Sequence, residues 1–437
     1  MTQNRRSFLH ASGTAAALAM APGNVLGAND TIRVGVVGLR GRGRGHVRYY
    51  AEIENVEVAA LCDTDERILD DYIADNKNKL SADFQTYYDY REMLEDGTLD
   101  AVSIATPNHW HALMGIWACQ AGKDAYVEKP CSHNLYEGQK LVEAQKKYNR
   151  IVAHGTQTRS STAVQEAIDL LHSGYLGEVY YAKGMCYKWR DTIGHTPTTE
   201  APEGVHYDLW TGPAPEQPFS RNRHHYNWHW QWEYGNGDIG NQGVHEMDVA
   251  RWGLDVEFPA VVASMGGHFM FEDDQETPNT LVSTFKYPDV NKMLVFEVRH
   301  WITPNPMYQK TGNNVIGVTF MGSKGYLQTT ANGYRAYLGR EAKLDKQADG
   351  GRSHQLGHFQ NFIDAMRSRK QSDLTATIRE GHISSGLCHL ANASYRTESM
   401  VHFDPESEKA IDNPAANKIL YGEERGYRSP YDVPDQI

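Results

Sequence analysis

The sequence predicts an α/β protein, with an N-terminal doubly wound parallel sheet and a C-terminal α+β domain built on a large, open, mostly antiparallel sheet. Three observations predict this fold. Short β-branched runs alternate with helical segments up to about residue 155, a glycine-rich turn follows the first run, and later strand-like runs lack intervening helices. Alternation implies a parallel sheet, whereas consecutive strands indicate an antiparallel one.

The chain length and charge limit the possibilities. A chain of 437 residues is too long for one ordinary core. We expect domains at residues 31–155 and 156–400 and a Pro- and charge-rich tail at 401–437. The net charge of -12 argues against a nucleic-acid partner, because phosphate binding needs clustered Lys and Arg. The five cysteines lack the spacing of a metal site or redox pair.

Residues 1–30 have the layout of a signal peptide. Arg5 and Arg6 precede a mild apolar stretch at 15–20, and small residues follow it. Paired arginines in this setting resemble a twin-arginine signal, so we expect a periplasmic or secreted protein exported in folded form. A disordered basic tail is the alternative. No segment approaches the roughly 20 apolar residues that span a bilayer, so no membrane span is expected.

The first expected strand, residues 31–37, leads into a glycine-rich turn and then a helix. Gly38 and Gly43 occupy two slots of a dinucleotide-binding turn, and Arg40 fills the slot between them. Glycines let the backbone approach a pyrophosphate, and the helix N-terminus supplies free N–H groups. We therefore assign Gly38, Arg40, Arg42 and Gly43 to cofactor binding in a Rossmann domain.

Asp63 follows the second expected strand, residues 56–61, where an acid would meet the adenosine ribose hydroxyls. A carboxylate there favours NAD because it repels the 2′-phosphate of NADP. Arg40 and Arg42 argue weakly for NADP, since either could bind a phosphate. NAD is the expected cofactor, with NADP less favoured.

The alternation continues through the rest of the first domain. We expect helices at residues 66–79, 111–120 and 135–148, and strands at residues 101–105, 125–127 and 151–153. Ligands of doubly wound sheets bind at the carboxyl ends of the strands. The polar residues there are Asp63, Thr106, Asn108, Glu128 and Lys129.

Two motifs carry a family resemblance. The run Thr106-Pro107-Asn108-His109-Trp110-His111, followed by Glu128-Lys129-Pro130, resembles the Gfo/Idh/MocA oxidoreductases, a family that includes glucose–fructose oxidoreductase and inositol dehydrogenase. The resemblance extends from about residue 31 to about 396. It implies that Lys129 reaches the nicotinamide and the substrate. The cofactor site is then expected to include Thr106, Pro107, Asn108, His111, Glu128, Lys129 and Gln157.

Strand-like runs dominate the second domain after a helix at 163–172. They cover residues 178–186, 260–266, 279–287, 292–299 and 315–322. Residues 341–353 are polar and are expected to form a loop. Helices expected at 358–368 and 381–396 would return to pack on the first domain.

An aromatic insertion lies between the first two of these strands. Residues 206–210 and 224–232 are rich in Tyr, Trp and His, whose rings stack on sugar C–H surfaces while polar tips bind hydroxyls. We assign Tyr226, Trp228 and Trp230 to a carbohydrate substrate; a loop cap or a subunit interface is the alternative. The histidines lack nearby acids at ligand spacing, so no metal site is predicted.

A second motif lies in residues 240–252. His245 and Asp248 fall nearly one turn apart on one face of a helix. The segment resembles the family's second motif, in which a histidine handles a proton beside the lysine, and this makes Lys129, His245 and Asp248 the expected catalytic residues. Asp248 would orient His245 or pair with an arginine. Many relatives have an acid four residues before the histidine; here Asn241 stands there, and we assign it, with His245, to the substrate site.

These residues predict an NAD(P)-dependent oxidoreductase that acts on a CH–OH group of a sugar, glycoside or cyclitol. An NAD-dependent glycosidase that uses transient C3 oxidation and elimination is one alternative, and an inactive sugar-binding protein is another. We expect a tightly held cofactor, since no dependable nicotinamide pool exists outside the cytoplasm. A homo-oligomer, dimeric or tetrameric, is also expected.

Overall fold

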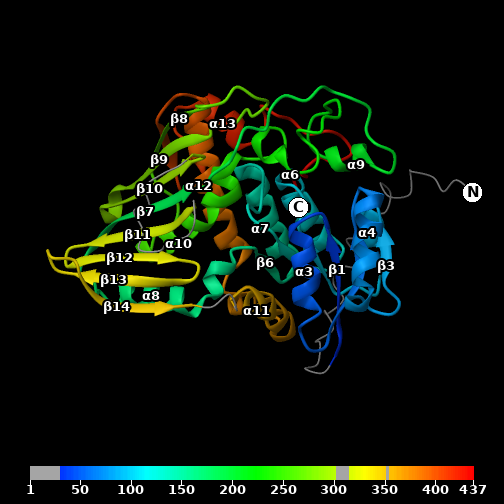
Figure 1. Ribbon diagram of the computed structural model, residues 1–437, viewed down its shortest axis with the longest axis horizontal. Coiled ribbons are helices and arrows are strands. Elements are labelled where there is room, and N and C mark those ends of the chain that lie inside the picture. The colour runs from blue at the N-terminus through cyan, green and yellow to red at the C-terminus, as the bar shows by residue number, and fades with distance from the viewer. Residues whose placement is uncertain (1–29, 302–313, 351–353) are drawn as a thin grey trace, which may run out of the picture.

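The computed structural model describes residues 30–301, 314–350 and 354–437 (Figure 1). Residues 1–29 of the expected signal segment lie outside the described part. The strands form a six-stranded sheet of order β3-β2-β1-β4-β5-β6 and a ten-stranded sheet of order β14-β13-β12-β11-β7-β10-β9-β8-β15-β16. The first sheet is parallel and the second is mostly antiparallel, so the predicted fold class is confirmed.

The first sheet carries helices on both faces. Its strands are β1 (Ile32–Val37), β2 (Val56–Cys62), β3 (Gln85–Tyr87), β4 (Ala101–Ile104), β5 (Asp124–Val127) and β6 (Val152–His154). The helices between them are α3 (Arg42–Tyr50), α4 (Glu66–Asn76), α5 (Tyr90–Leu94), α6 (Asn108–Gln120) and α7 (Leu135–Tyr148). Strands β4 and β5 are buried along their whole length, as apolar runs between two helical layers should be. The strand order reverses between β1 and β4, which opens a crevice at their carboxyl ends.

The second sheet is larger and covered by helices on one face. Its strands are β7 (Val179–Tyr187), β8 (Val261–Gly267), β9 (Thr280–Tyr287), β10 (Lys292–Arg299), β11 (Val315–Gly322), β12 (Gly325–Thr330), β13 (Gly333–Leu338), β14 (Lys343–Asp349), β15 (Val401–Asp404) and β16 (Lys409–Ala410). The β7–β10 pair is parallel, whereas the neighbouring pairs are antiparallel. The covering helices are α8 (Thr162–His172), α10 (Val244–Leu254) and α12 (Ile378–Arg396).

The structure differs from the sequence prediction at two edges of this sheet. Residues 341–353, expected to be a loop, contain strand β14. Its side chains are mostly exposed, so it shows no alternation of apolar and polar residues. Strands β15 and β16 continue the sheet into the segment expected to be a tail, and α13 (Pro414–Leu420) follows them.

The C-terminal part of the chain returns to the first domain. Helix α11 (His354–Ser368) buries Phe359 in the same apolar cluster as Val34 of β1. On the opposite face of the sheet, Tyr431 packs into the cluster formed by α6 and α7. Among the helices that the structure describes, none is long and apolar enough to cross a membrane.

Residues 188–238, here called the insertion, connect β7 with the segment before α10 and pass over α6 in Figure 1. Regular structure is sparse: α9 (Tyr207–Thr211) and a 3-10 turn (Asn227–Trp230), followed by a π-type turn (Ile239–Gly243) that leads into α10. Backbone hydrogen bonds attach the insertion just beyond β2. The amide of His206 donates to Thr64 O (2.8 Å), and the amide of Glu66 donates to Gly204 O (2.9 Å).

Candidate active site

A cavity of about 430 Å³ lies at the carboxyl ends of the first sheet's strands, next to the insertion and the start of α10. It brings together fifteen of the predicted site residues: Gly38, Arg40, Arg42, Asp63, Thr106, Pro107, Asn108, His111, Glu128, Lys129, Gln157, Tyr226, Trp228, Asn241 and His245. It is also lined by residues that the sequence did not single out, among them Tyr88, Trp210, His225, His229 and Gln355. The placement of these side chains is observed, and the roles assigned to them remain predictions.

Three predicted site residues do not line this cavity. A Cβ on Gly43 would lie 2.0 Å from Gly38 O, so this glycine is needed for packing α3 against the turn. Trp230 is 2% exposed, and the Arg190 guanidinium lies 4.9 Å from its ring centroid. Its indole packs between Arg190 and His300 and does not line the cavity. The third residue is Asp248.

Asp248 is held in a buried ion network behind α10. Its carboxylate accepts hydrogen bonds from Arg159 Nε (2.7 Å), Arg159 Nη2 (2.9 Å) and Ser384 Oγ (2.6 Å). Burial alone would raise the pKa of Asp248, but the Arg159 guanidinium lowers it below its ordinary value. Both oxygens are engaged away from the cavity, so Asp248 lies outside the group around Lys129 and ties α10 to α12, and its catalytic role stays a prediction.

The glycine turn lets the protein backbone come close to a bound ligand. Gly38 has a φ of +88°, and a Cβ there would lie 2.6 Å from Ala105 O. Helix α3 begins at Arg42 without a side-chain cap, so its first amides face the cavity unclaimed by a capping side chain. This cradle of glycine backbone and helix N-terminus fits the pyrophosphate of a dinucleotide.

Asp63 lies at the end of β2, on the same cavity. Its Oδ2 accepts a hydrogen bond from Leu39 N (2.6 Å) and its Oδ1 from Asp65 N (3.0 Å). Burial raises the pKa of Asp63 to about 6, so the carboxyl is mainly ionised at neutral pH. An ionised acid next to the turn fits the ribose hydroxyls of NAD and not a 2′-phosphate.

Glu128 organises the floor of the cavity. Its Oε1 accepts from Arg42 Nε (2.6 Å), Gln157 Nε2 (3.0 Å) and the buried His46 Nε2 (3.1 Å). Burial would raise the pKa of Glu128, yet Arg42 and His46 hold it well below its ordinary value. Arg42 and Gln157, both predicted to bind cofactor, are therefore partly committed to fixing Glu128.

Lys129 follows directly and extends toward the π-type turn. Its Nζ donates to Asn241 O, and burial lowers its pKa although Glu128 opposes that shift. His111 fixes the two motif segments to each other: its ring nitrogens lie 2.6 Å from Pro130 O and 2.7 Å from Thr106 O. The ammonium group is thus held at a defined point of the cavity wall.

Asp238 is a site residue that the sequence analysis missed. It accepts from Arg190 Nη2 (2.9 Å), His300 Nε2 (2.9 Å) and Asn241 Nδ2 (3.0 Å). Burial would raise the pKa of Asp238, but Arg190 and His300 keep it well below its ordinary value. An acid, Asp238, thus lies next to Asn241 although it is three residues earlier in the sequence than the acid of the family motif. The π-type turn brings the Asp238 and Asn241 side chains together.

His245 completes the group around Lys129. No hydrogen-bond partner of its Nδ1 is found among the described residues. Burial, reinforced by the charge of Lys129, lowers the pKa of His245 to about 3, so the imidazole is neutral. The site therefore pairs a fixed cation with an uncharged proton acceptor.

The insertion supplies the aromatic wall. Tyr226 is 44% exposed, and its hydroxyl lies 3.5 Å from Arg190 Nη1. The Trp228 ring stacks on His229, with the ring centroids 3.6 Å apart. Two of the three predicted substrate-binding aromatics, Tyr226 and Trp228, thus face the cavity.

Comparison with known families matches both domains. Residues 32–156 match the Gfo/Idh/MocA description "Oxidoreductase family, NAD-binding Rossmann fold", and residues 160–268 match "Oxidoreductase family, C-terminal alpha/beta domain". The chain belongs to the Gfo/Idh/MocA oxidoreductase family. The resemblance noted from the two motifs is therefore confirmed, and so is an NAD-binding Rossmann domain.

Individual relatives are more distant. A Glycosyl hydrolase family 109 protein of Shewanella pealeana is 28% identical over 158 residues, which is 35% of each chain. This chain thus spans about a third of the length of the curated relatives it matches.

Solved structures share the fold over most of the chain. The WlbA dehydrogenase from Bordetella pertussis, in complex with NADH and UDP-GlcNAcA, aligns with a TM-score of 0.63 at 20% identity, covering 86% of this chain and 99% of that one. The aldose–aldose oxidoreductase from Caulobacter crescentus aligns with a TM-score of 0.65 at 17% identity, covering 85% and 100%. At these identities the likeness concerns the fold alone.

Proposed function

We propose that this protein is an NAD-dependent oxidoreductase that acts on a CH–OH group of a sugar, glycoside or cyclitol. The observation that carries the proposal is that Lys129 and His245 line the same cavity as the Gly38 turn and Asp63. When bound there, NAD supplies the hydride acceptor for oxidation of the substrate carbon. The residues of the chain then have to bind the substrate and move its hydroxyl proton.

Lys129 and His245 divide that work. The Lys129 ammonium, fixed toward the Asn241 carbonyl, donates a hydrogen bond to the substrate hydroxyl oxygen. The neutral His245 takes the hydroxyl proton. The positive charge of Lys129 nearby stabilises the negatively charged substrate oxygen that this transfer leaves. Acid–base assistance of this kind contributes about 10²–10⁴-fold to a rate.

A carbohydrate fits the aromatic wall. Tyr226 and Trp228 offer ring faces for sugar C–H surfaces, and the Asn241 side chain lines the same cavity. The structural neighbours crystallised with a nucleotide sugar or named for aldoses support a sugar substrate for this fold.

We propose in addition that the chain is exported through the Arg5–Arg6 signal to the periplasm or the medium, with NAD(H) retained in the cavity. A retained cofactor allows catalysis outside the cytoplasm, where no dependable nicotinamide pool exists. Assembly as a homo-oligomer is part of the same proposal, and sedimentation of the purified protein tests it.

Denaturing the purified protein and identifying the released small molecules by mass spectrometry tests the central proposal. We expect NAD or NADH in near-stoichiometric amount. Protein that releases no dinucleotide and binds none on addition would refute the oxidoreductase. Sugar binding without any turnover would favour the inactive binding protein.

A redox glycosidase is the second candidate, favoured by the Glycosyl hydrolase family 109 relatives. In that reaction C3 of a glycoside is oxidised, the C2 proton becomes acidic, a base such as His245 or Tyr226 removes it, and the C1 substituent leaves. Addition of water and reduction of C3 complete a hydrolysis with no net redox change. A glycoside deuterated at C2 separates the candidates, because elimination exchanges the deuterium with solvent and simple oxidation at another carbon retains it.

A further inference from the structure

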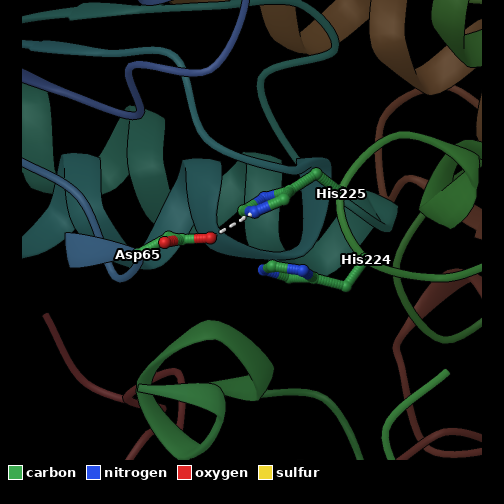
Figure 2. A group of neighbouring side chains, drawn as sticks. All are labelled: Asp65, His224 and His225. Atoms are coloured by element: carbon green, nitrogen blue, oxygen red, sulfur yellow. Dashed lines mark hydrogen bonds and ion pairs between the residues drawn. The ribbon is translucent and has the colours of Figure 1, made fainter. Parts of the chain in front are cut away.

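One cluster of ligating side chains lies outside the Lys129–His245 group, at the opposite end of the cavity. Asp65, just beyond β2, meets His224 and His225 of the insertion. Their ligand atoms all lie within 4.8 Å of one another. Figure 2 shows the carboxylate and both imidazole rings pointing toward a common centre, with the insertion supplying the two rings.

The cluster is largely buried, and one of its imidazole nitrogens has no hydrogen-bond partner among the described residues. Asp65 is 1% exposed and His224 is 7% exposed. His225 Nε2 lies 2.8 Å from Asp65 Oδ2, whereas His224 Nε2 has no hydrogen-bond partner in the part of the chain that the structure describes. A buried imidazole nitrogen normally finds a partner, so this nitrogen, in a group with a carboxylate and a second imidazole, has a lone pair available for a ligand.

We propose that Asp65, His224 and His225 bind a divalent first-row transition metal ion such as Zn²⁺. Two imidazole nitrogens and one carboxylate oxygen suit Zn²⁺, which binds such donors at about 2.0–2.2 Å. Mg²⁺ and Ca²⁺ prefer sets made of oxygen ligands and are excluded by the two imidazoles. His225 also lines the cavity, so the proposed ion lies beside the Asp63 end of the site.

The ion has to compete with positive side chains. Arg67 donates to Asp65 through Nε (3.0 Å) and Nη2 (2.8 Å). Its side chain is 54% exposed, so it can turn into solvent when an ion takes one carboxylate oxygen. The charges of Arg67 and Arg40 also act on both histidines. Binding therefore depends strongly on the negative charge of Asp65.

The position of the cluster gives the ion a structural role. It joins the insertion to the start of α4, beside the contacts of Glu66: the Glu66 amide bonds Gly204 O, and the Glu66 carboxylate lies 2.9 Å from His206 Nε2. An ion at this junction fastens the insertion over the Asp63 end of the cavity. Metal binding is measured without added substrate or cofactor and needs no turnover, so its outcome does not depend on the proposed oxidation.

Calorimetric titration of untagged, chelator-treated full-length protein with ZnCl₂ and CoCl₂ tests the site. We expect one tight ion per chain, a higher thermal midpoint with Zn²⁺, and the intense visible bands of four- or five-coordinate Co²⁺. MgCl₂ should produce none of these changes. Absence of saturable Zn²⁺ and Co²⁺ binding by the folded parent overturns the proposal.

Matched variants separate ligation from loop docking. His224→Ala and Asp65→Asn should each weaken Zn²⁺ binding by at least about tenfold. His206→Gln is the control, because His206 also joins the insertion to an acid at the start of α4 but lies outside the cluster. Its Zn²⁺ affinity should equal the parent's. The proposal fails if all three variants bind as the parent does, or if His206→Gln loses as much as His224→Ala. Circular dichroism verifies folding, and His224→Gln replaces His224→Ala should the latter not fold.

Discussion

The two ends of the cavity are built in different ways. At one end, Lys129 and His245 stand on the turn after β5 and on α10, and buried charges around Glu128 and Asp238 hold them. At the other end, Asp63 faces an insertion attached by a few hydrogen bonds just beyond β2. Lys129 and His245 thus stand on core elements, with Arg190 and Asp238 of the insertion packed behind them, whereas the cover over the Asp63 end comes from the insertion. Substitutions at the Lys129–His245 end should change turnover, and those at the Asp63 end should change cofactor retention.

The largest expected effect concerns a residue that the sequence placed at the chemical end. Asp248→Asn removes one of the two carboxylates that pair with the buried Arg159 and leaves only Glu380, and loss of one member of a buried ion pair lowers the free energy of unfolding by about 3–5 kcal/mol. Chemical denaturation measures this loss. The exposed Asp289→Asn is the control and should stay within about 0.5 kcal/mol of the parent. A stable Asp248→Asn protein with strongly reduced turnover would return Asp248 to the catalytic group.

Lys129→Met tests the chemical end directly. The substitution keeps much of the side-chain length and removes the charge and donors, so turnover should fall by about 10²-fold or more while bound NAD stays unchanged. Steady-state kinetics together with cofactor quantification check both parts. Lys140→Met, at a surface pair with Glu143, should behave as the parent. Turnover within threefold of the parent in Lys129→Met would mean that the family motif misassigns this lysine.

Asp63→Ala tests the other end. Loss of the carboxylate that faces the ribose position should raise the NAD dissociation constant by about tenfold and relax discrimination against NADP, because a charge-assisted hydrogen bond and a repulsive charge disappear together. Binding titrations with both dinucleotides check this. An unchanged preference for NAD over NADP would indicate that Arg40 and Arg42, and not Asp63, determine which dinucleotide binds.

The same contrast explains what the sequence could predict. Strands such as β1 and β5 and the motif around Lys129 were predictable, because local periodicity and short motifs carry their signal. The cluster at Asp65 was not: His225 lies 160 residues further along the chain, and ligand spacing reads only neighbouring residues. The prediction of no metal site rested on that spacing.

Two further misses have physical causes. Helical spacing placed Asp248 on the same helix face as His245, yet Arg159, from outside that helix, turns its carboxylate away from the cavity. Strand β14 lies at an exposed sheet edge, where no buried face imposes an apolar pattern. In both cases the outcome depends on tertiary contacts, which a local sequence pattern does not reveal.

The smallest expected effect is a pH dependence that belongs to the Asp63 end alone. Burial raises the pKa of Asp63 from 3.8 to about 6, so the free folded protein holds this proton more tightly than the unfolded chain does. For the free protein, Asp63 therefore adds stability as pH falls from about 6 toward 3.8.

Cofactor binding reverses this sign. Ribose hydroxyls donate to the ionised carboxylate, so NAD binding below the pKa of Asp63 must release its proton. NAD affinity should be near its maximum at pH 7, fall to about half of that maximum at pH 6, and weaken roughly fourfold between pH 7 and pH 5.5. Binding titrations across this range should show the loss in the parent and a flat profile in Asp63→Asn, which has no proton to release. Equal pH dependence in both proteins would place the titrating group elsewhere, and the two ends of the cavity would then not differ in the way that their construction implies.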